Sequence, residues 1–171
     1  MNTTTTTASA FFYIDGIPTK GTWVDLDEST TWDDIAAAIR EKIPGAVIDE
    51  ILCADAEGLA RNFLSRYDCF SLGEWQTWSE AAGRSHLDPD ILAAYCENVG
   101  EWTEEAVSKA EDAYAGTFDN SEDFAYDYAE QTGILESVPE NLRYYFDFEK
   151  FGRDLMAGDY FENHDHYFHN C

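Results

Sequence analysis

The sequence predicts an α+β protein built as a chain of three small domains, and three observations indicate this. Strand-like segments separated by turn residues occupy the first third of the 171 residues. From Leu72 to about Ala113 the strand signals vanish and short helical patterns replace them. Helix and strand signals then mix again in the last third. The expected parts are a flexible tail at residues 1–10, a mixed α/β N-terminal domain at 11–70, a helical middle domain at 71–113 and a mixed α/β C-terminal domain at 114–171.

The N-terminal domain is expected to be a ββαβ unit. Phe11–Asp15 and Gly21–Leu26 are rich in strand-forming residues, and the Gly and Pro residues of the segment DGIPTKG between them predict a turn. Ala46–Ala54 has the pattern of a third strand, and Gly58–Arg66 that of a helical turn. A ββαβ unit would therefore close near residue 70.

A helix is expected between the second and third strands. Thr30 or Thr31 can cap its N-terminus, where the carboxylates of Asp33 and Asp34 are also favoured. The Pro44-Gly45 pair ends it. Its apolar residues follow helical spacing and predict one buried face: Trp32, Ile35, Ala36, Ile39 and Ile43.

The middle domain is expected to consist of three short helices, within residues 73–87, 88–99 and 102–115. Asp88 stands before a proline at the first helical position, which is a typical helix start. Thr103 begins the last helix, whose inward residues are expected to be Ala106, Val107 and Ala110.

The C-terminal domain is expected to combine helices with short terminal strands. A helix follows Ser121, the segment VPENL begins a helical turn, and a further helix ends at Gly158. The segments DYF and HYFHN near the end have strand character. Helical spacing predicts these inward residues: Phe124, Ala125 and Tyr128 on the first helix, and Phe148, Phe151 and Leu155 on the last.

The net charge of this chain is unusually negative. It has 35 acidic and 10 basic side chains, for a net charge of −25, yet 44% of its residues are hydrophobic, which excludes a disordered acidic tail. Residues 1–73, 74–100 and 101–171 carry net charges of −7, −4 and −14. Such charge disfavours binding to nucleic acid or to an anionic membrane. The expected electrostatic partner is a basic protein surface or a metal cation.

The charge density is comparable with that of DNA. Duplex DNA carries one charge per roughly 1.7 Å, so 25 charges correspond to roughly 43 Å, or about 13 base pairs. A compact globule could not display this charge as a line, but an elongated chain of small domains could. The carboxylates expected to form a partner-binding acidic face are Glu104, Glu105, Glu111, Asp112, Asp119, Glu122, Asp123, Asp127, Glu130, Glu136 and Glu140.

Other classes of function have weaker support in the sequence. The segment HDHYFHNC offers zinc or copper donors in His164, Asp165, His166, His169 and Cys171. In a strand, His164 and His166 would share a face. A polar terminal strand is the favoured interpretation, so no metal, cofactor or catalytic residue is predicted. A salt-adapted acidic protein without a specific partner is a further alternative. The tryptophans are interpreted as core anchors, because base-stacking platforms would need nearby cations.

Cysteine spacing and the apolar pattern of the sequence indicate the cellular compartment. The four cysteines include no CxxC pair, and the start MNTTTTTASA lacks the charged and apolar regions of a signal peptide. No apolar run approaches the roughly 18 residues of a membrane span. We expect a cytoplasmic protein with reduced thiols and no membrane partner.

Two segments of the last third carry a specific residue pattern: AYAGTFDNSEDFAYDYAEQTG and VPENLRYYFDFEKFGRDLMAGDYF. Together with GTWVDL near the start, they resemble the ArdA-type antirestriction proteins, a family of DNA mimics carried by mobile elements. Ser71–His86 resembles the family only weakly, and the Thr-rich start and His-rich end depart from it. The second segment matches the family pattern at Pro139, Leu142, Tyr145, Asp147, Phe148, Glu149, Arg153, Asp154 and Leu155.

The resemblance implies an elongated arrangement of three small domains and a head-to-head homodimer. It implies inhibition of type I restriction-modification enzymes by occupation of their DNA channel, without catalysis or a cofactor. It also implies that the region Val138–Leu155 lies in or near the dimer contact. The residues expected there are Tyr145, Asp147, Phe148, Glu149, Phe151, Arg153, Asp154 and Leu155.

Overall fold

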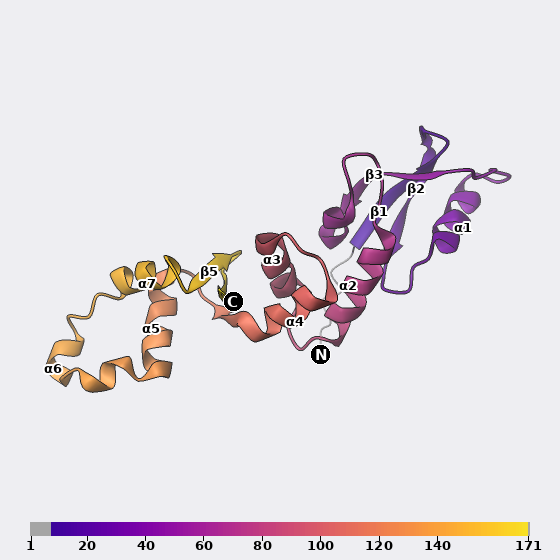
Figure 1. The fold of residues 1–171 in the computed structure, drawn as a ribbon. Coiled ribbons are helices and arrows are strands. Elements are labelled where there is room, and N and C mark those ends of the chain that lie inside the picture. Colours follow the sequence, from indigo (N-terminus) through magenta and orange to yellow (C-terminus); the bar gives the residue numbers. More distant parts are fainter. Residues whose placement is uncertain (1–7, 171) are drawn as a thin grey trace. The chain divides into compact units, whose positions relative to one another are not determined.

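The computed structural model describes residues 8–170 and confirms the α+β class (Figure 1). Backbone contacts divide the chain into two compact units. The N-terminal unit runs to Pro89 and includes Trp102–Val107. The C-terminal unit contains Asp90–Glu101 and the residues from Ser108 onward. The division into three domains stays a prediction.

A three-stranded antiparallel sheet forms the base of the N-terminal unit. It consists of β1 (Ala8–Ile14), β2 (Ile17–Leu26) and β3 (Ile51–Glu57), in the order β2-β1-β3. The predicted turn over DGIPTKG is wrong in length, since only Asp15 and Gly16 form it, with φ of 57° and 67°. Two consecutive residues with positive φ match the right-handed twist of a hairpin.

Two predicted strand boundaries also require correction. The third strand begins at Ile51, not Ala46, because Ile51 already pairs with Ile14 at the end of β1 and earlier residues have no strand beside them. The predicted tail at 1–10 is wrong for residues 8–10, which pair with Val24–Leu26. Its remaining residues lie outside the described part of the chain.

Helix α1 (Trp32–Lys42) has the predicted cap. Thr31 and Asp34 form a reciprocal capping box, in which each side chain accepts a hydrogen bond from the other's backbone N–H. The buried residues Ile35, Ala36 and Ile39 confirm the predicted face. Trp32 and Ile43 are less buried than predicted, so the buried stripe is narrower.

An aromatic cluster joins a 3₁₀ helix, an α-helix and Trp102 in the N-terminal unit. The 3₁₀ helix η1 (Gly58–Phe63) ends at Phe63, whose ring contacts Trp75 and Trp78 of α2 (Leu72–Arg84) and also Trp102. The Trp75 indole N–H donates to the Asp27 carbonyl at 3.0 Å. The core-anchor interpretation therefore holds for these three tryptophans, but it is wrong for Trp23 and Trp32, which are 44% and 43% exposed.

Helices α3 (Pro89–Val99) and α4 (Glu104–Ala113) lie where the sequence predicts helices. The Thr103 hydroxyl accepts a hydrogen bond from the Ala106 N–H at 3.1 Å and so caps α4. The predicted inward residues of α4 are all buried: Ala106, Val107 and Ala110.

The C-terminal unit contains a second three-stranded antiparallel sheet, of order β4-β6-β5. Strands β5 (Tyr160–Asn163) and β6 (His166–His169) confirm the predicted terminal strands. Strand β4 (Tyr114–Thr117) was not predicted, because its residues continue a helical pattern. It forms through pairing with distant residues, including Tyr114 with Phe168.

Two helices cover the core of the C-terminal unit. Helix α5 (Ser121–Thr132) begins after the cap Asn120, not after Ser121, and α7 (Phe148–Met156) ends two residues before the predicted Gly158. The core consists of Phe124 and Ala125 of α5, Leu155 of α7 and Tyr167 of β6, with Tyr128, Phe148 and Phe151 partly buried against them. This largely confirms the predicted inward faces.

The segment between α5 and α7 packs little against this core. It contains η2 (Ile134–Ser137) and α6 (Glu140–Arg143), and neither element has a buried residue. Figure 1 shows α6 away from the β-strands of its own unit.

Candidate partner-binding surface

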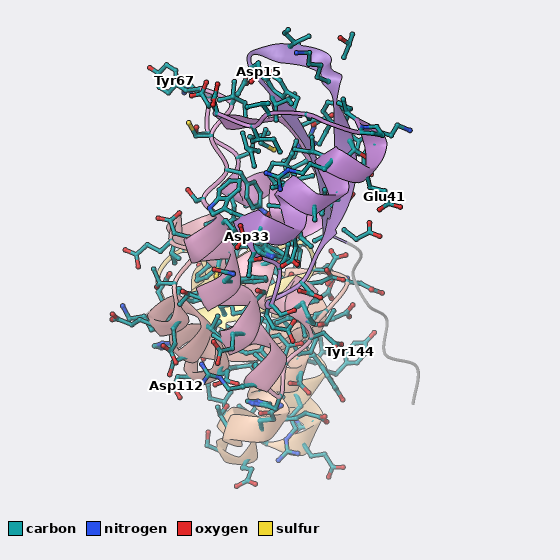
Figure 2. All side chains as sticks on the ribbon, turned by 90° about the vertical axis from the view of Figure 1, so that its right-hand side faces the viewer. Asp15, Asp33, Glu41, Tyr67, Asp112 and Tyr144 are labelled. Carbon is teal, nitrogen blue, oxygen red and sulfur yellow. The ribbon has the colours of Figure 1, made fainter. Side chains whose placement is uncertain are left out.

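The carboxylates of the predicted acidic face lie at the surface. Glu111 and Asp127 are half-buried, and the others are exposed. Glu104 and Glu105 belong to the N-terminal unit, whereas the remaining nine belong to the C-terminal unit. Figure 2 shows carboxylate oxygens on the outside of the ribbon, among them those of Glu41 and Asp112.

Helix α5 holds a ridge of carboxylates through neutral hydrogen-bond donors. The Asn120 amide donates to Asp123 at 2.8 Å, and the Gln131 amide donates to Asp127 at 2.6 Å. The Tyr126 hydroxyl donates to Glu130 at 3.0 Å, and this bond is the main cause that raises the pKa of Tyr126. These partners restrict the carboxylates without cancelling their charge.

The C-terminal unit has few cations to offset its acids. Its residues include 18 acidic side chains against four basic ones, which are Lys109, Arg143, Lys150 and Arg153. The Arg143 side chain donates to the Val138 carbonyl at 3.1 Å, so it also stabilises its own loop. The large negative charge is therefore a property of a folded unit.

In the N-terminal unit one arginine forms an ion pair with a carboxylate of the predicted acidic face. Arg84 lies 2.9 Å from a Glu104 oxygen and 3.7 Å from a Glu80 oxygen. Exposed ion pairs of this kind contribute little to stability. They do lower the local negative charge, so Glu104 is a weaker candidate for partner contact than the acids of α5.

The residues expected at a dimer contact divide into two groups. Leu155 is buried and Phe148 and Phe151 are half-buried, so these side chains pack inside their own unit. Asp147 accepts a hydrogen bond from the Lys150 N–H at 2.9 Å and caps α7. The exposed members are Tyr145, Asp147, Glu149, Arg153 and Asp154.

Sequence reasoning missed one exposed aromatic residue beside Tyr145, namely Tyr144. Tyr144 and Tyr145 are 90% and 77% exposed, their rings contact edge to face, and Leu142 is also exposed. Tyr144 did not enter the predicted site. The signal available was two adjacent tyrosines in a segment too short for a buried helical face.

The predicted shared strand face of His164 and His166, on which the alternative of a metal site depended, is wrong. His164 lies in the turn between β5 and β6, with φ of 53°, and therefore does not share a strand face with His166. Its Nε2 lies 3.1 Å from Glu97, whereas His166 Nδ1 lies 2.9 Å from the Thr117 hydroxyl. Within residues 8–170 no group of three or more metal-ligating side chains gathers. Cys171 lies outside those residues.

None of the helices within residues 8–170 combines the length and the apolar character that crossing a bilayer requires.

Comparison with known proteins identifies one family. The family model described as antirestriction protein (ArdA) matches residues 12–169, which is nearly the whole chain. No curated protein matches the sequence.

Proposed function

Since the chain belongs to the ArdA antirestriction family, we propose that it inhibits type I restriction-modification enzymes by DNA mimicry. Its exposed carboxylates stand in for DNA phosphates and occupy the basic DNA-binding cleft of the enzyme. The protein forms no covalent intermediate and needs no cofactor. It acts in the cytoplasm, where restriction enzymes meet incoming DNA.

The observation that carries this proposal is the α5 ridge. Asp123, Asp127 and Glu130 accept hydrogen bonds from neutral side chains, so each keeps its charge while its position is restricted. Charges fixed before binding lose less conformational freedom when a partner engages them. The ridge therefore resembles a rigid row of phosphates more closely than a flexible acidic tail would.

Spacing explains why the proposal needs many carboxylates. Acids three or four apart on a helix stand roughly 5–6 Å from each other. Duplex DNA has one charge per roughly 1.7 Å of its axis, so a single helical row reaches only about a third of that density. Several acidic elements must act together, and no single carboxylate should dominate the binding free energy.

A homodimer extends this surface. We place the contact between copies in the region Val138–Leu155, as the family resemblance implies. The exposed side chains of Leu142, Tyr144 and Tyr145 support this, because large exposed aromatic residues are typical of protein interfaces. Asp147, Phe148 and Leu155 support the contact indirectly by fixing α7.

Competition with DNA tests the proposal. A purified type I methyltransferase is loaded with a fluorescent duplex that contains its target site, and the full-length protein is titrated in at about 50 mM and about 300 mM salt. We expect displacement of the duplex at low salt and much weaker displacement at high salt, since the contact is electrostatic. A protein that displaces no DNA at low salt would exclude DNA mimicry.

Two simple measurements distinguish the alternative functions, a metal-binding protein and a salt-adapted protein without a partner. Elemental analysis of untagged protein would reveal bound zinc or copper if the histidine segment formed a metal site. A salt-adapted protein without a partner would keep its fold, measured by circular dichroism, at both salt concentrations and bind no methyltransferase at either.

A further inference from the structure

The sheet of the N-terminal unit presents two aromatic rings on the face opposite its core. Ala8, Ala10, Phe12 and Ile14 of β1 are buried and share the core face. Tyr13 lies on the opposite face and is also buried, with its hydroxyl donating to Asp68 at 2.7 Å. Phe11 points to the other face, where its ring contacts Trp23 of β2 edge to face at 5.7 Å. Trp23 is 44% exposed and Phe11 is half-buried. Solvent-facing strand positions are normally polar, so this pair requires an explanation.

The strand register places carboxylates beside the two rings. Phe11 pairs with Trp23 on one side and with Asp55 on the other, so the three side chains lie in a row across one face of the sheet. In the neighbouring row Ser9 pairs with Asp25 and with Glu57. Asp25, Asp55 and Glu57 are all exposed, and these two rows contain no lysine or arginine.

A glycine of β2 lies beside this aromatic pair. A Cβ at Gly21 of β2 would lie 2.5 Å from the Phe12 carbonyl oxygen and 2.8 Å from two ring carbons of Phe11. Glycine in a strand is normally unfavourable because it packs nothing and loses more entropy. Here it gives the Phe11 ring room to lie against the sheet and support Trp23. We name Phe11, Trp23, Asp25, Asp55 and Glu57 the sheet patch.

We propose that the sheet patch docks an arginine side chain of a basic partner protein, with the guanidinium stacked on Trp23 and paired with the surrounding carboxylates. Guanidinium groups stack on aromatic faces and donate in a fork to carboxylates, and tryptophan is the most favourable ring for a cation. Charge complementarity selects this occupant, because three carboxylates repel nucleic acid and acidic proteins. The inference rests on the proposed function and extends it, since a basic DNA-binding cleft would supply the arginine.

Two matched pairs of variants test the docking. Trp23→Leu removes the exposed ring but keeps an apolar side chain, and Trp32→Leu is its control, because Trp32 has nearly the same exposure, 43%. A double variant with Asp25→Asn and Glu57→Gln is compared with one carrying Glu41→Gln and Asp49→Asn, which changes the same charge on exposed residues outside the patch. Thermal melts establish that each variant folds. If Trp23→Leu does not fold, the comparison of the two carboxylate variants tests the docking proposal.

The first measurement is affinity for the type I methyltransferase at about 150 mM salt. Loss of the ring should weaken binding roughly three- to thirtyfold, and Trp32→Leu should bind like the wild type. Equal affinities for both tryptophan variants, with equal affinities for both carboxylate variants, overturn the docking proposal while leaving DNA mimicry intact.

The second measurement does not depend on the methyltransferase. A short arginine peptide and a lysine peptide of equal charge are titrated into the 15N-labelled protein, and the indole N–H signals are followed by NMR. We expect the chemical shift of the Trp23 indole N–H to change saturably with peptide concentration, and to change more with the arginine peptide than with the lysine peptide. The indole N–H signal of Trp32 should not move. A Trp23 signal that neither peptide moves overturns the proposal, even if the methyltransferase binds.

A third measurement separates the partner from a second copy of the chain. If the sheet patch were an interface between copies, Trp23→Leu would lower the mass observed in sedimentation at micromolar concentration, and that result would overturn arginine docking. An unchanged mass with weakened partner binding supports it.

Discussion

Gly152 of α7 lies directly against the backbone of Ser121 at the start of α5. A Cβ at Gly152 would overlap the Ser121 carbonyl oxygen, so only glycine permits the observed packing of the two helices. This contact fixes α7, which carries Leu155 into the core, beside the acidic ridge of α5. The packing of the C-terminal unit and the placement of its charges therefore depend on the same contact.

The first prediction concerns this glycine. Gly152→Ala should lower the free energy of unfolding by about 1–3 kcal/mol, because overlap with a backbone atom outweighs the gain in helix propensity. Gly83→Ala is the control: a Cβ there meets no atom within 4 Å in the described part of the chain, so the change should stabilise α2 by about 0.5–1 kcal/mol. Urea denaturation measures both, and equal effects would contradict the close approach.

The second prediction separates folding from dimerisation. Leu155→Ala should lower the free energy of unfolding by about 2–5 kcal/mol, since Leu155 is buried in the core. Tyr145→Ala should leave the monomer's fold intact and raise the dimer dissociation constant roughly tenfold or more. Sedimentation velocity over a range of concentrations measures this, with the exposed Tyr67→Ala as control. A Tyr145 variant that dimerises like wild type would remove this residue from the contact.

The third prediction concerns the distribution of charge. A variant with four changes on exposed glutamates of the C-terminal unit, Glu122→Gln, Glu130→Gln, Glu136→Gln and Glu140→Gln, should lose most of its ability to displace DNA. Each change alone should matter little, because exposed charges contribute about 1 kcal/mol or less. The matched control neutralises four exposed acids of the N-terminal unit: Glu28, Glu41, Asp49 and Glu50. Equal loss in both variants would show that net charge alone decides binding.

The fourth prediction concerns pH and the α1 cap. Hydrogen bonds from the Thr31 side chain and backbone lower the pKa of Asp34 below its usual 3.8. The charged carboxylate therefore stabilises the fold above about pH 4, and this contribution is lost as pH falls through the lowered folded-state pKa. Asp34→Asn should melt at a lower temperature than wild type at pH 7, and the gap should close at strongly acidic pH. A gap that stays constant with pH would contradict the role of the ionised carboxylate.

The fifth prediction concerns the thiols. Burial raises the pKa of Cys53 to about 12, whereas Cys69 is exposed. In a Cys171→Ser background, a thiol reagent at neutral pH should modify Cys69 quickly and Cys53 only after unfolding. Mass spectrometry of digested protein identifies the modified residue. Rapid labelling of Cys53 in the native state would contradict its burial.

Several features of the fold were predictable because local physics specifies them. The Thr31 cap, the buried stripe of α1 and the inward face of α4 follow from residue type and helical spacing, without any distant partner. The excess of acids over bases is likewise a direct property of the sequence. Carboxylates on helices that also bury an apolar stripe must lie outside, so their exposure was predictable too.

Other features depend on residues that are distant in the chain. Strand β4 exists because Tyr114 pairs with Phe168, and the sequence around Tyr114 still has a helical pattern. The predicted face of His164 and His166 failed because the β5–β6 pairing puts His164 in the turn. The pairing of Phe11 with Trp23 and Asp55 likewise required the register of three strands.

By itself the sequence determined the α+β class, most helices and the negative charge, because composition and periodicity are local properties. Tertiary structure alone decided which aromatic side chains are buried and which are exposed, which carboxylates have neutral partners, and why Gly152 must be glycine. These depend on strand register and helix packing, which bring together residues that are separated along the chain.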